Sequence, residues 1–286
     1  MSFINTLENY QKKINSFLEE YLSGKKGELY DAVKYSLLAG GKRIRPVLAL
    51  AVCDALEGDN KKALVFGTAL EMIHTYSLIH DDLPCMDNDD FRRGKPTNHK
   101  VFGEATAVLS GDALLNMACE LITEAGFDAK ITVEALRIIY TSSGAEGMVG
   151  GQMLDMKAEK VSLNEDELYL LHKKKTGALI DAAASLGAIC AEKDKDLLKG
   201  YSASLGIAFQ IRDDILDVDG DEISLGKPVN SDEKNNKVTF VTLYGIGGAQ
   251  NKLMEETQNA IDSLEFLGEK GKFLKELALY LLNRES

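Results

Sequence analysis

The stretch His80-Asp81-Asp82-Leu83-Pro84-Cys85-Met86-Asp87-Asn88-Asp89-Asp90-Phe91-Arg92-Arg93-Gly94-Lys95 places five carboxylates directly before three cations. Because Pro84 cannot continue a helix, we expect Asp81 and Asp82 on the last turn of a helix and Asp87 in the loop beyond it. Carboxylates this close repel one another, and Mg2+ relieves that repulsion while keeping positions for phosphate oxygens. The stretch predicts a magnesium-diphosphate site, in which Arg92 and Arg93 bind phosphate. A solvated acidic loop with salt-bridged arginines is the alternative.

A second acidic group lies in the apolar run Phe209-Gln210-Ile211-Arg212-Asp213-Asp214-Ile215-Leu216-Asp217. At roughly 100° per residue, Gln210 and the three aspartates share one side of a helix. Carboxylates beside a core are costly unless a cation or a polar cleft receives them. Two such groups in one chain indicate a metal site between two helices. Its natural ligand is a diphosphate clamped between carboxylate-bound Mg2+ and basic side chains.

Apolar residues recur at helical spacing through most of the chain, as in Leu29, Val33 and Leu37, and only four prolines interrupt them. Strand-type alternation is scarce, so the sequence predicts an all-α fold. No segment resembles a linker, and we expect one domain over residues 1–286. Helices are expected over residues 28–39, 61–83 and 104–122, the last of them buried, and a helix interruption at Gly177.

A basic turn, Lys42-Arg43-Ile44-Arg45, lies between Gly40-Gly41 and Pro46, where one helix ends and the next begins. Cations at a helix N-terminus oppose the helix dipole unless an anion binds there. The turn is therefore a candidate anion site, and a solvated basic turn is the alternative.

Composition excludes several classes of function. The formal net charge of −12 argues against nucleic acid as a partner. Residues 1–10 lack the features of a signal peptide, and no apolar run is expected to cross a bilayer, so we expect a cytoplasmic protein. The four cysteines are far apart and indicate neither a zinc site nor a disulfide framework. Nucleotide-binding glycine loops and serine-hydrolase elbows are absent, and a phosphohydrolase at His80-Asp81 would need additional histidine ligands.

Asp-Asp-x4-Asp followed by Arg-Arg-Gly, with a later Phe-Gln-x2-Asp-Asp-x2-Asp, resembles the motif pair of the trans-isoprenyl diphosphate synthases, most closely the bacterial farnesyl diphosphate synthases. The resemblance covers nearly the whole chain. It implies a helical bundle of the isoprenoid synthase type around a central active-site cavity. It also implies condensation of isopentenyl diphosphate with dimethylallyl and geranyl diphosphate to give farnesyl diphosphate, with three Mg2+ ions and a homodimer.

The resemblance also assigns roles to individual residues. The expected metal ligands are Asp81, Asp82, Asp87, Asp213 and Asp217, and the expected catalytic residues are these five with Arg92, Lys175 and Asp214. Isopentenyl diphosphate is expected at Lys42, Arg45, His74 and Arg93. The allylic diphosphate is expected at Arg92, Lys175, Thr176, Gln210, Lys227 and Lys237. The segment Val229-Asn230-Ser231-Asp232 departs from the commoner Gly-Lys-Asp pattern, and Gln152 and Asp155 are expected to support the site from behind.

Product length is assigned by resemblance to Tyr76 and its neighbour Ser77, because a bulky residue five positions before the first aspartate limits the family's products to fifteen carbons. Helix geometry alone does not show this, since Tyr76 lies about 140° from Asp81 around the helix. A geranylgeranyl diphosphate synthase is the near alternative. A non-catalytic prenyl diphosphate-binding subunit would be expected to have lost aspartates, and a terpene cyclase would have no use for the Lys42-Arg45 site.

Overall fold

Two apolar helices, α4 (Asn60–Asp81) and α10 (Ala178–Cys190), lie in contact at the centre of the protein and are buried along most of their length. The computed structural model describes residues 2–158, 161–219 and 238–283. In chain order the remaining helices are α1 (Phe3–Tyr21), α2 (Glu28–Leu37), α3 (Ile44–Ala55), α5 (Asn98–Phe102), α6 (Glu104–Glu124), α7 (Ala129–Ser143), α8 (Met148–Ala158), α9 (Glu165–His172), the π-helical turn η1 (Lys173–Gly177), α11 (Lys199–Asp219), α14 (Phe240–Asp262), the 3-10 turn η2 (Glu265–Gly271) and α15 (Lys272–Leu282). The predicted all-α fold is confirmed.

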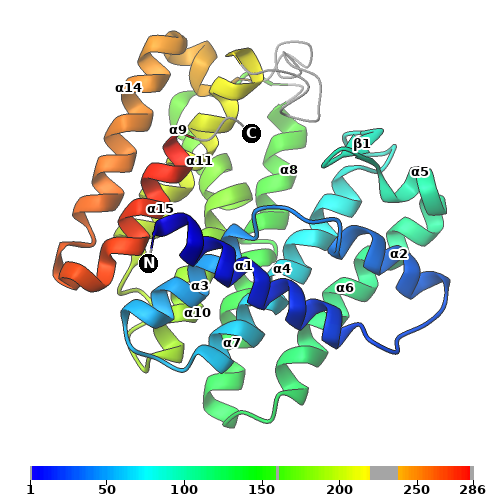
Figure 1. Ribbon diagram of the computed structural model, residues 1–286. Coiled ribbons are helices and arrows are strands. Elements are labelled where there is room, and N and C mark those ends of the chain that lie inside the picture. The colour runs from blue at the N-terminus through cyan, green and yellow to red at the C-terminus, as the bar shows by residue number, and fades with distance from the viewer. Residues whose placement is uncertain (1, 159–160, 220–237, 284–286) are drawn as a thin grey trace.

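The other helices surround this central pair (Figure 1). Helix α3 packs against both α4 and α10, while α6 covers α4 and α7 covers α10. The first helix crosses the bundle and reaches α15, where the Phe3 and Phe273 rings lie 5.1 Å apart. A smaller apolar cluster joins α9, α11 and α14. The arrangement brings α4 and α11, which carry the two acidic groups, into one bundle.

The ends of helix α4 are set by a capping side chain at its N-terminus and by a nearby proline at its C-terminus. The Asp59 side chain caps its N-terminus by accepting from the Lys61 amide at 2.9 Å. At the other end Asp81 is the last helical residue and Asp82 is the cap, two positions before Pro84. The predicted placement of both aspartates at a helix end is confirmed, and the predicted helices at 28–39 and 61–83 end two residues earlier than expected.

Helix α6 differs from its prediction as a buried helix. Leu109 is 57 % exposed, and the flank that carries it and Val108 is open. An 18-residue window of α6 has a mean hydropathy of 1.3, with 44 % of it buried, so this helix meets the length and composition of a membrane span, against expectation. Because α6 also packs on α2, α4, α5 and α7, we interpret it as a helix of the bundle.

Candidate active site

A cavity of about 900 Å³ opens between the end of α4, the start of α3, helix α8, η1 and α11. The predicted site residues among its lining are Arg45, His74, Tyr76, Ser77, Asp81, Asp87, Arg92, Lys175, Thr176, Gln210 and Asp213. Gln152, expected behind the site, also lines the cavity directly. Side chains more than one hundred residues apart in sequence therefore share one cavity. The volume suits a small organic ligand with a charged head group.

The loop after α4 folds back on the helix end. The Asp87 amide donates to the Asp81 carbonyl oxygen at 2.8 Å, and Asn88 takes a left-handed conformation with φ of 53°. This turn returns Asp87 to Asp81, and both line the cavity. Burial raises the pKa of Asp81 to about 6; Lys175 across the cavity opposes the rise, and Asp87 adds to it. Two carboxylates held this way are suited to a cation.

Asp82 points away from the large cavity and binds Arg92. Arg92 Nε lies 2.6 Å and its terminal nitrogen 2.5 Å from the same Asp82 oxygen. Burial lowers the Arg92 pKa, but the Asp82 contact outweighs it and the net shift is upward. Arg92 thus stays charged beside the carboxylates. Arg92 lines both the large cavity and a smaller pocket beside it, whereas Asp82 lines the smaller pocket.

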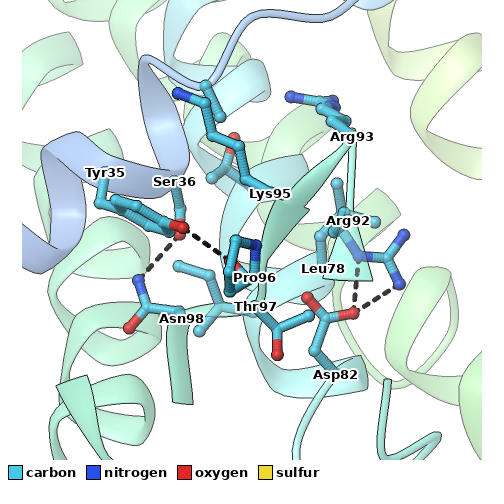
Figure 2. Close-up of a pocket in the computed structure, with 13 residues that line it drawn as sticks. Tyr35, Ser36, Leu78, Asp82, Arg92, Arg93, Lys95, Pro96, Thr97 and Asn98 are labelled. Atoms are coloured by element: carbon cyan, nitrogen blue, oxygen red, sulfur yellow. Dashed lines mark hydrogen bonds and ion pairs between the residues drawn. The ribbon is translucent and has the colours of Figure 1, made fainter. Parts of the chain in front are cut away.

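That smaller pocket, of about 30 Å³, shows how the Arg-Arg-Gly segment is held (Figure 2). The segment forms a hairpin in which β1 (Phe91–Arg92) pairs with β2 (Lys95–Pro96), with Arg93 and Gly94 at its turn. The Tyr35 hydroxyl donates to the Pro96 carbonyl oxygen at 2.8 Å, and this contact ties the hairpin to α2. The hairpin therefore projects Arg92 and Arg93 from a fixed base.

The basic turn is held from beneath by Arg43, a residue to which the motifs assign no role. Arg43 has φ of 52° and is 2 % exposed. Its guanidinium donates to Glu71 Oε1 at 2.9 Å, to the Leu37 carbonyl oxygen at 2.7 Å and to Asn15 Oδ1 at 3.1 Å. Three helices thus hold the turn that presents Lys42 and Arg45. The sequence offered one sign of this pair: Glu71 is the single charged residue in the apolar run of residues 69–73, and a buried charge needs a partner of opposite charge.

Arg45 and His74 line the large cavity next to this turn, and Arg93, which lines the smaller pocket, lies close enough to both to shift their pKa values. The Arg93 side chain donates to the Gly40 carbonyl oxygen at 2.6 Å, and a Cβ at Gly41 would lie 2.7 Å from its guanidinium carbon. Gly41 also has φ of 111°, a conformation that favours glycine. Burial lowers the Arg45 pKa to about 10. Burial, followed by repulsion from Arg45 and the other arginines, lowers the His74 pKa, so His74 is neutral. A surplus of positive charge here favours an anion.

Lys175 approaches the cavity from η1. Its ammonium lies 2.6 Å from Asp155 Oδ2 on α8. The close approach depends on Gly151, where a Cβ would lie only 2.3 Å from the Lys175 amide nitrogen. A π-helical turn interrupts the α-helical ladder, and such turns are frequent at functional sites. The expected interruption is confirmed, and Asp155 supports Lys175 directly.

The second acidic group divides between the cavity and the core. Asp213 and Gln210 line the cavity, while Asp214 is buried and accepts from the Phe240 amide at 2.8 Å and from Gln210 Nε2 at 3.0 Å. The Thr176 hydroxyl donates to Gln210 Oε1 at 3.1 Å. Asp217 is 2 % exposed. The sequence predicts that Gln210 and the three aspartates face one cleft from the same side of α11. They do not all face the cavity, because α14 packs over part of that side.

Some predicted features stand apart from this geometry. Lys227, Lys237 and the segment Val229 to Asp232 lie outside the described residues. In the part of the chain that the structure describes, no three acidic, histidine or cysteine side chains converge as a ready-made metal cage. The four cysteines are free thiols; Cys53 and Cys190 are buried, and Cys85 is exposed.

An all-helical bundle with carboxylates and arginines around one cavity defines a protein that binds phosphorylated ligands. The chain belongs to the polyprenyl synthetase family, whose profile matches residues 26–272. A farnesyl diphosphate synthase from Micrococcus luteus is 47 % identical over 274 residues, which cover 95 % of this chain and 94 % of that protein. A farnesyl diphosphate synthase from Bacillus subtilis is 48 % identical over 257 residues, covering 86 % of each. The crystal structure of an FPP/GFPP synthase from Zymomonas mobilis superposes with a TM-score of 0.88 at 37 % identity, covering 98 % of each chain.

Proposed function

We propose that this protein is a short-chain trans-prenyltransferase that condenses isopentenyl diphosphate with dimethylallyl and then geranyl diphosphate to give farnesyl diphosphate. The observation that carries the proposal is one cavity lined by Asp81 and Asp87 from the first motif, by Asp213 from the second, and by Arg45 and Lys175. It is also supported by relatives named farnesyl diphosphate synthase, whose similarity covers most of the chain.

Magnesium fits the donors present. Mg2+ is usually bound by one or two carboxylates, several waters and substrate phosphate oxygens, so it does not need a dense protein cage. Asp81 and Asp87 offer two adjacent carboxylates on one wall, and Asp213 offers a third on α11. We assign the ions to these residues first. Asp82, which faces the smaller pocket, and Asp217, which is buried, are proposed as further ligands, and three ions are the expected number. When bound, the ions would neutralise part of the charge that builds on the leaving diphosphate.

The chain's own residues position the allylic substrate. Arg92, fixed by Asp82, and Lys175, fixed by Asp155, direct cations at the diphosphate. Their charge stabilises the leaving group as its carbon-oxygen bond breaks, and fixed cations need no reorganisation at that moment. The carbocation that remains is sheltered from water by the apolar wall, to which Met148 and Phe209 contribute. Lys227 and Lys237 are proposed to complete this clamp.

Isopentenyl diphosphate occupies the basic side of the same cavity. Lys42, Arg45 and Arg93 bind its diphosphate, and neutral His74 can donate to a phosphate oxygen without adding charge. Its double bond attacks the allylic carbon, forming the new carbon-carbon bond. The cation formed by this addition loses a proton to the departing diphosphate, which restores a double bond in the product.

Product length is set in this proposal by Tyr76 and Ser77, which line the cavity one turn below Asp81. The Tyr76 ring is 8 % exposed and blocks the extension of the chain beyond fifteen carbons. A twenty-carbon product is the alternative, and it requires the Tyr76 ring to move out of the way of the growing prenyl chain. The protein is proposed to act in the cytoplasm, as one domain, and as a homodimer.

The test is a condensation assay with Mg2+ on matched aspartate variants. Asp81→Asn and Asp213→Asn each remove one charge facing the cavity, and turnover should fall by about 100- to 1,000-fold. Asp90→Asn is the control, because Asp90 belongs to the same acidic stretch but pairs with Lys100 at the surface. Near-normal turnover in either cavity variant contradicts the metal assignment. No condensation by the unmodified protein favours the binding-subunit alternative.

A further inference from the structure

The imidazole of His80 lies against the backbone of α6 in a notch made by Gly111. A Cβ at Gly111 would lie 2.0 Å from His80 Nε2, so no larger residue fits there while the ring stays in place. Nε2 lies 3.0 Å from the Val108 carbonyl oxygen. Since a carbonyl can only accept, Nε2 carries the proton and donates. The ring is thus fixed by a hydrogen bond and by a shape that only glycine provides.

The same ring packs on Tyr76, one helical turn earlier in α4. Their ring centroids lie 5.7 Å apart with an interplanar angle of 74°, the edge-to-face arrangement that aromatic rings prefer. Tyr76, His80 and Val108 all line the large cavity. A tyrosine on the wall of a cavity has other rotamers open to it, and a growing apolar chain pushes toward whichever of them makes room. His80 packs against the Tyr76 ring and so restricts its rotation.

We propose that His80, seated in the Gly111 notch, is a positioning residue that limits product length by holding the Tyr76 ring across the cavity. The inference rests on the proposed function, since it concerns the product of that same site. It assigns a role in specificity to a contact between α4 and α6. His80 acts through Tyr76 and takes no part in the chemical step.

The experiment measures the ratio of twenty- to fifteen-carbon products at equal conversion, with Mg2+, geranyl diphosphate and excess isopentenyl diphosphate. A ratio separates specificity from any loss of rate caused by changes next to Asp81. His80→Ala should raise the ratio by about tenfold, the factor that one aromatic pair supplies. Gly111→Ala should raise it too, because its methyl group displaces the imidazole. Gly247→Ala, where a Cβ meets nothing within 4 Å, is the control and should leave the ratio unchanged.

The Tyr76→Ala variant and the double variant separate this inference from the proposed function. If His80 acts through Tyr76, Tyr76→Ala/His80→Ala gives the same ratio as Tyr76→Ala alone. Lengthening in Tyr76→Ala with an unchanged ratio in His80→Ala overturns the role of His80, while farnesyl diphosphate synthesis stands. An unchanged ratio in Tyr76→Ala overturns both the proposed role of Tyr76 in limiting product length and the inference about His80. If Gly111→Ala does not fold, the product ratio of His80→Ala alone tests the role of His80.

Discussion

Arg43 and Glu71 form an ion pair whose nitrogen and oxygen lie 2.9 Å apart, with side chains only 1 % and 2 % exposed. The pair joins the basic turn to the middle of α4, the helix that ends in the first aspartates. Burying two charges is costly, and here the guanidinium also donates to the Leu37 carbonyl oxygen and to Asn15 Oδ1, which offsets part of that cost. The arrangement fixes the basic turn relative to the cavity.

Arg43→Lys should weaken isopentenyl diphosphate binding selectively. Lysine keeps the charge but cannot reproduce a guanidinium that reaches three acceptors, so Lys42 and Arg45 lose their support. We expect the KM for isopentenyl diphosphate to rise about tenfold and the free energy of unfolding to fall by about 3 kcal/mol. The KM for geranyl diphosphate should change little. Steady-state kinetics with each substrate varied in turn, together with denaturant unfolding, provides the measurement.

Lys62→Gln is the matched control for Arg43→Lys. Lys62 forms a surface ion pair with Asp59 at 3.5 Å, which contributes no more than about 1 kcal/mol. It should leave both KM values as they are. Equal increases in the two KM values of Arg43→Lys would show a general loss of structure and contradict the selective role.

Gly151→Ala should disturb the allylic side of the cavity. The added methyl group would lie 2.3 Å from the Lys175 amide nitrogen, so η1 must move away from α8 and carry the Lys175 ammonium with it. We expect a KM for geranyl diphosphate about tenfold higher, stability lower by about 1–3 kcal/mol, and little change in the KM for isopentenyl diphosphate. Gly247→Ala serves again as the helical control. An unchanged KM for geranyl diphosphate would mean that Lys175 does not bind that substrate.

His172 should make the protein sensitive to mild acid. Its ring stacks on Phe240 with centroids 5.4 Å apart, and burial lowers its pKa from 6.5 to about 3, with Asp155 and Lys175 acting in opposite directions. Below pH 6.5 the unfolded chain binds a proton that the folded chain does not bind until about pH 3. Stability is therefore lost as pH falls through this window, by about 2 kcal/mol at pH 5.

His172→Phe keeps the stacked ring and removes the titrating group. Denaturant unfolding at about pH 7.5 and about pH 5 should show a loss of stability smaller by about 2 kcal/mol in this variant than in the unmodified protein. Identical pH dependence in the two proteins would assign the acid sensitivity to other groups.

Residues close together in the sequence were enough to predict several features of the fold. Proline, glycine and apolar spacing placed Asp81 and Asp82 at the end of α4 and located the interruption at η1, because these features depend on neighbours along the chain. The partners of buried charges could not be found this way. Arg43 and Glu71 lie 28 residues apart, and only the packing of α3 on α4 brings them together.

Tertiary packing also decided which predicted carboxylates face the cavity. Asp82 turns to Arg92 because the hairpin folds over the end of α4, and Asp214 binds the start of α14 because that helix packs on α11. Helical periodicity describes which side of one helix a residue occupies, but not what covers that side. The seat of His80 on Gly111 likewise depends on how closely α4 and α6 approach.

The proposed synthesis of farnesyl diphosphate is best tested by product analysis. The purified protein is incubated with Mg2+, isopentenyl diphosphate and either dimethylallyl or geranyl diphosphate, and the chain lengths are resolved after the phosphates are removed. We expect a fifteen-carbon product from both allylic substrates and a longer one from Tyr76→Ala. A twenty-carbon product from the unmodified protein would contradict the role of Tyr76 in limiting product length and make the protein a geranylgeranyl diphosphate synthase. Absence of any condensation product would contradict the enzymatic function itself.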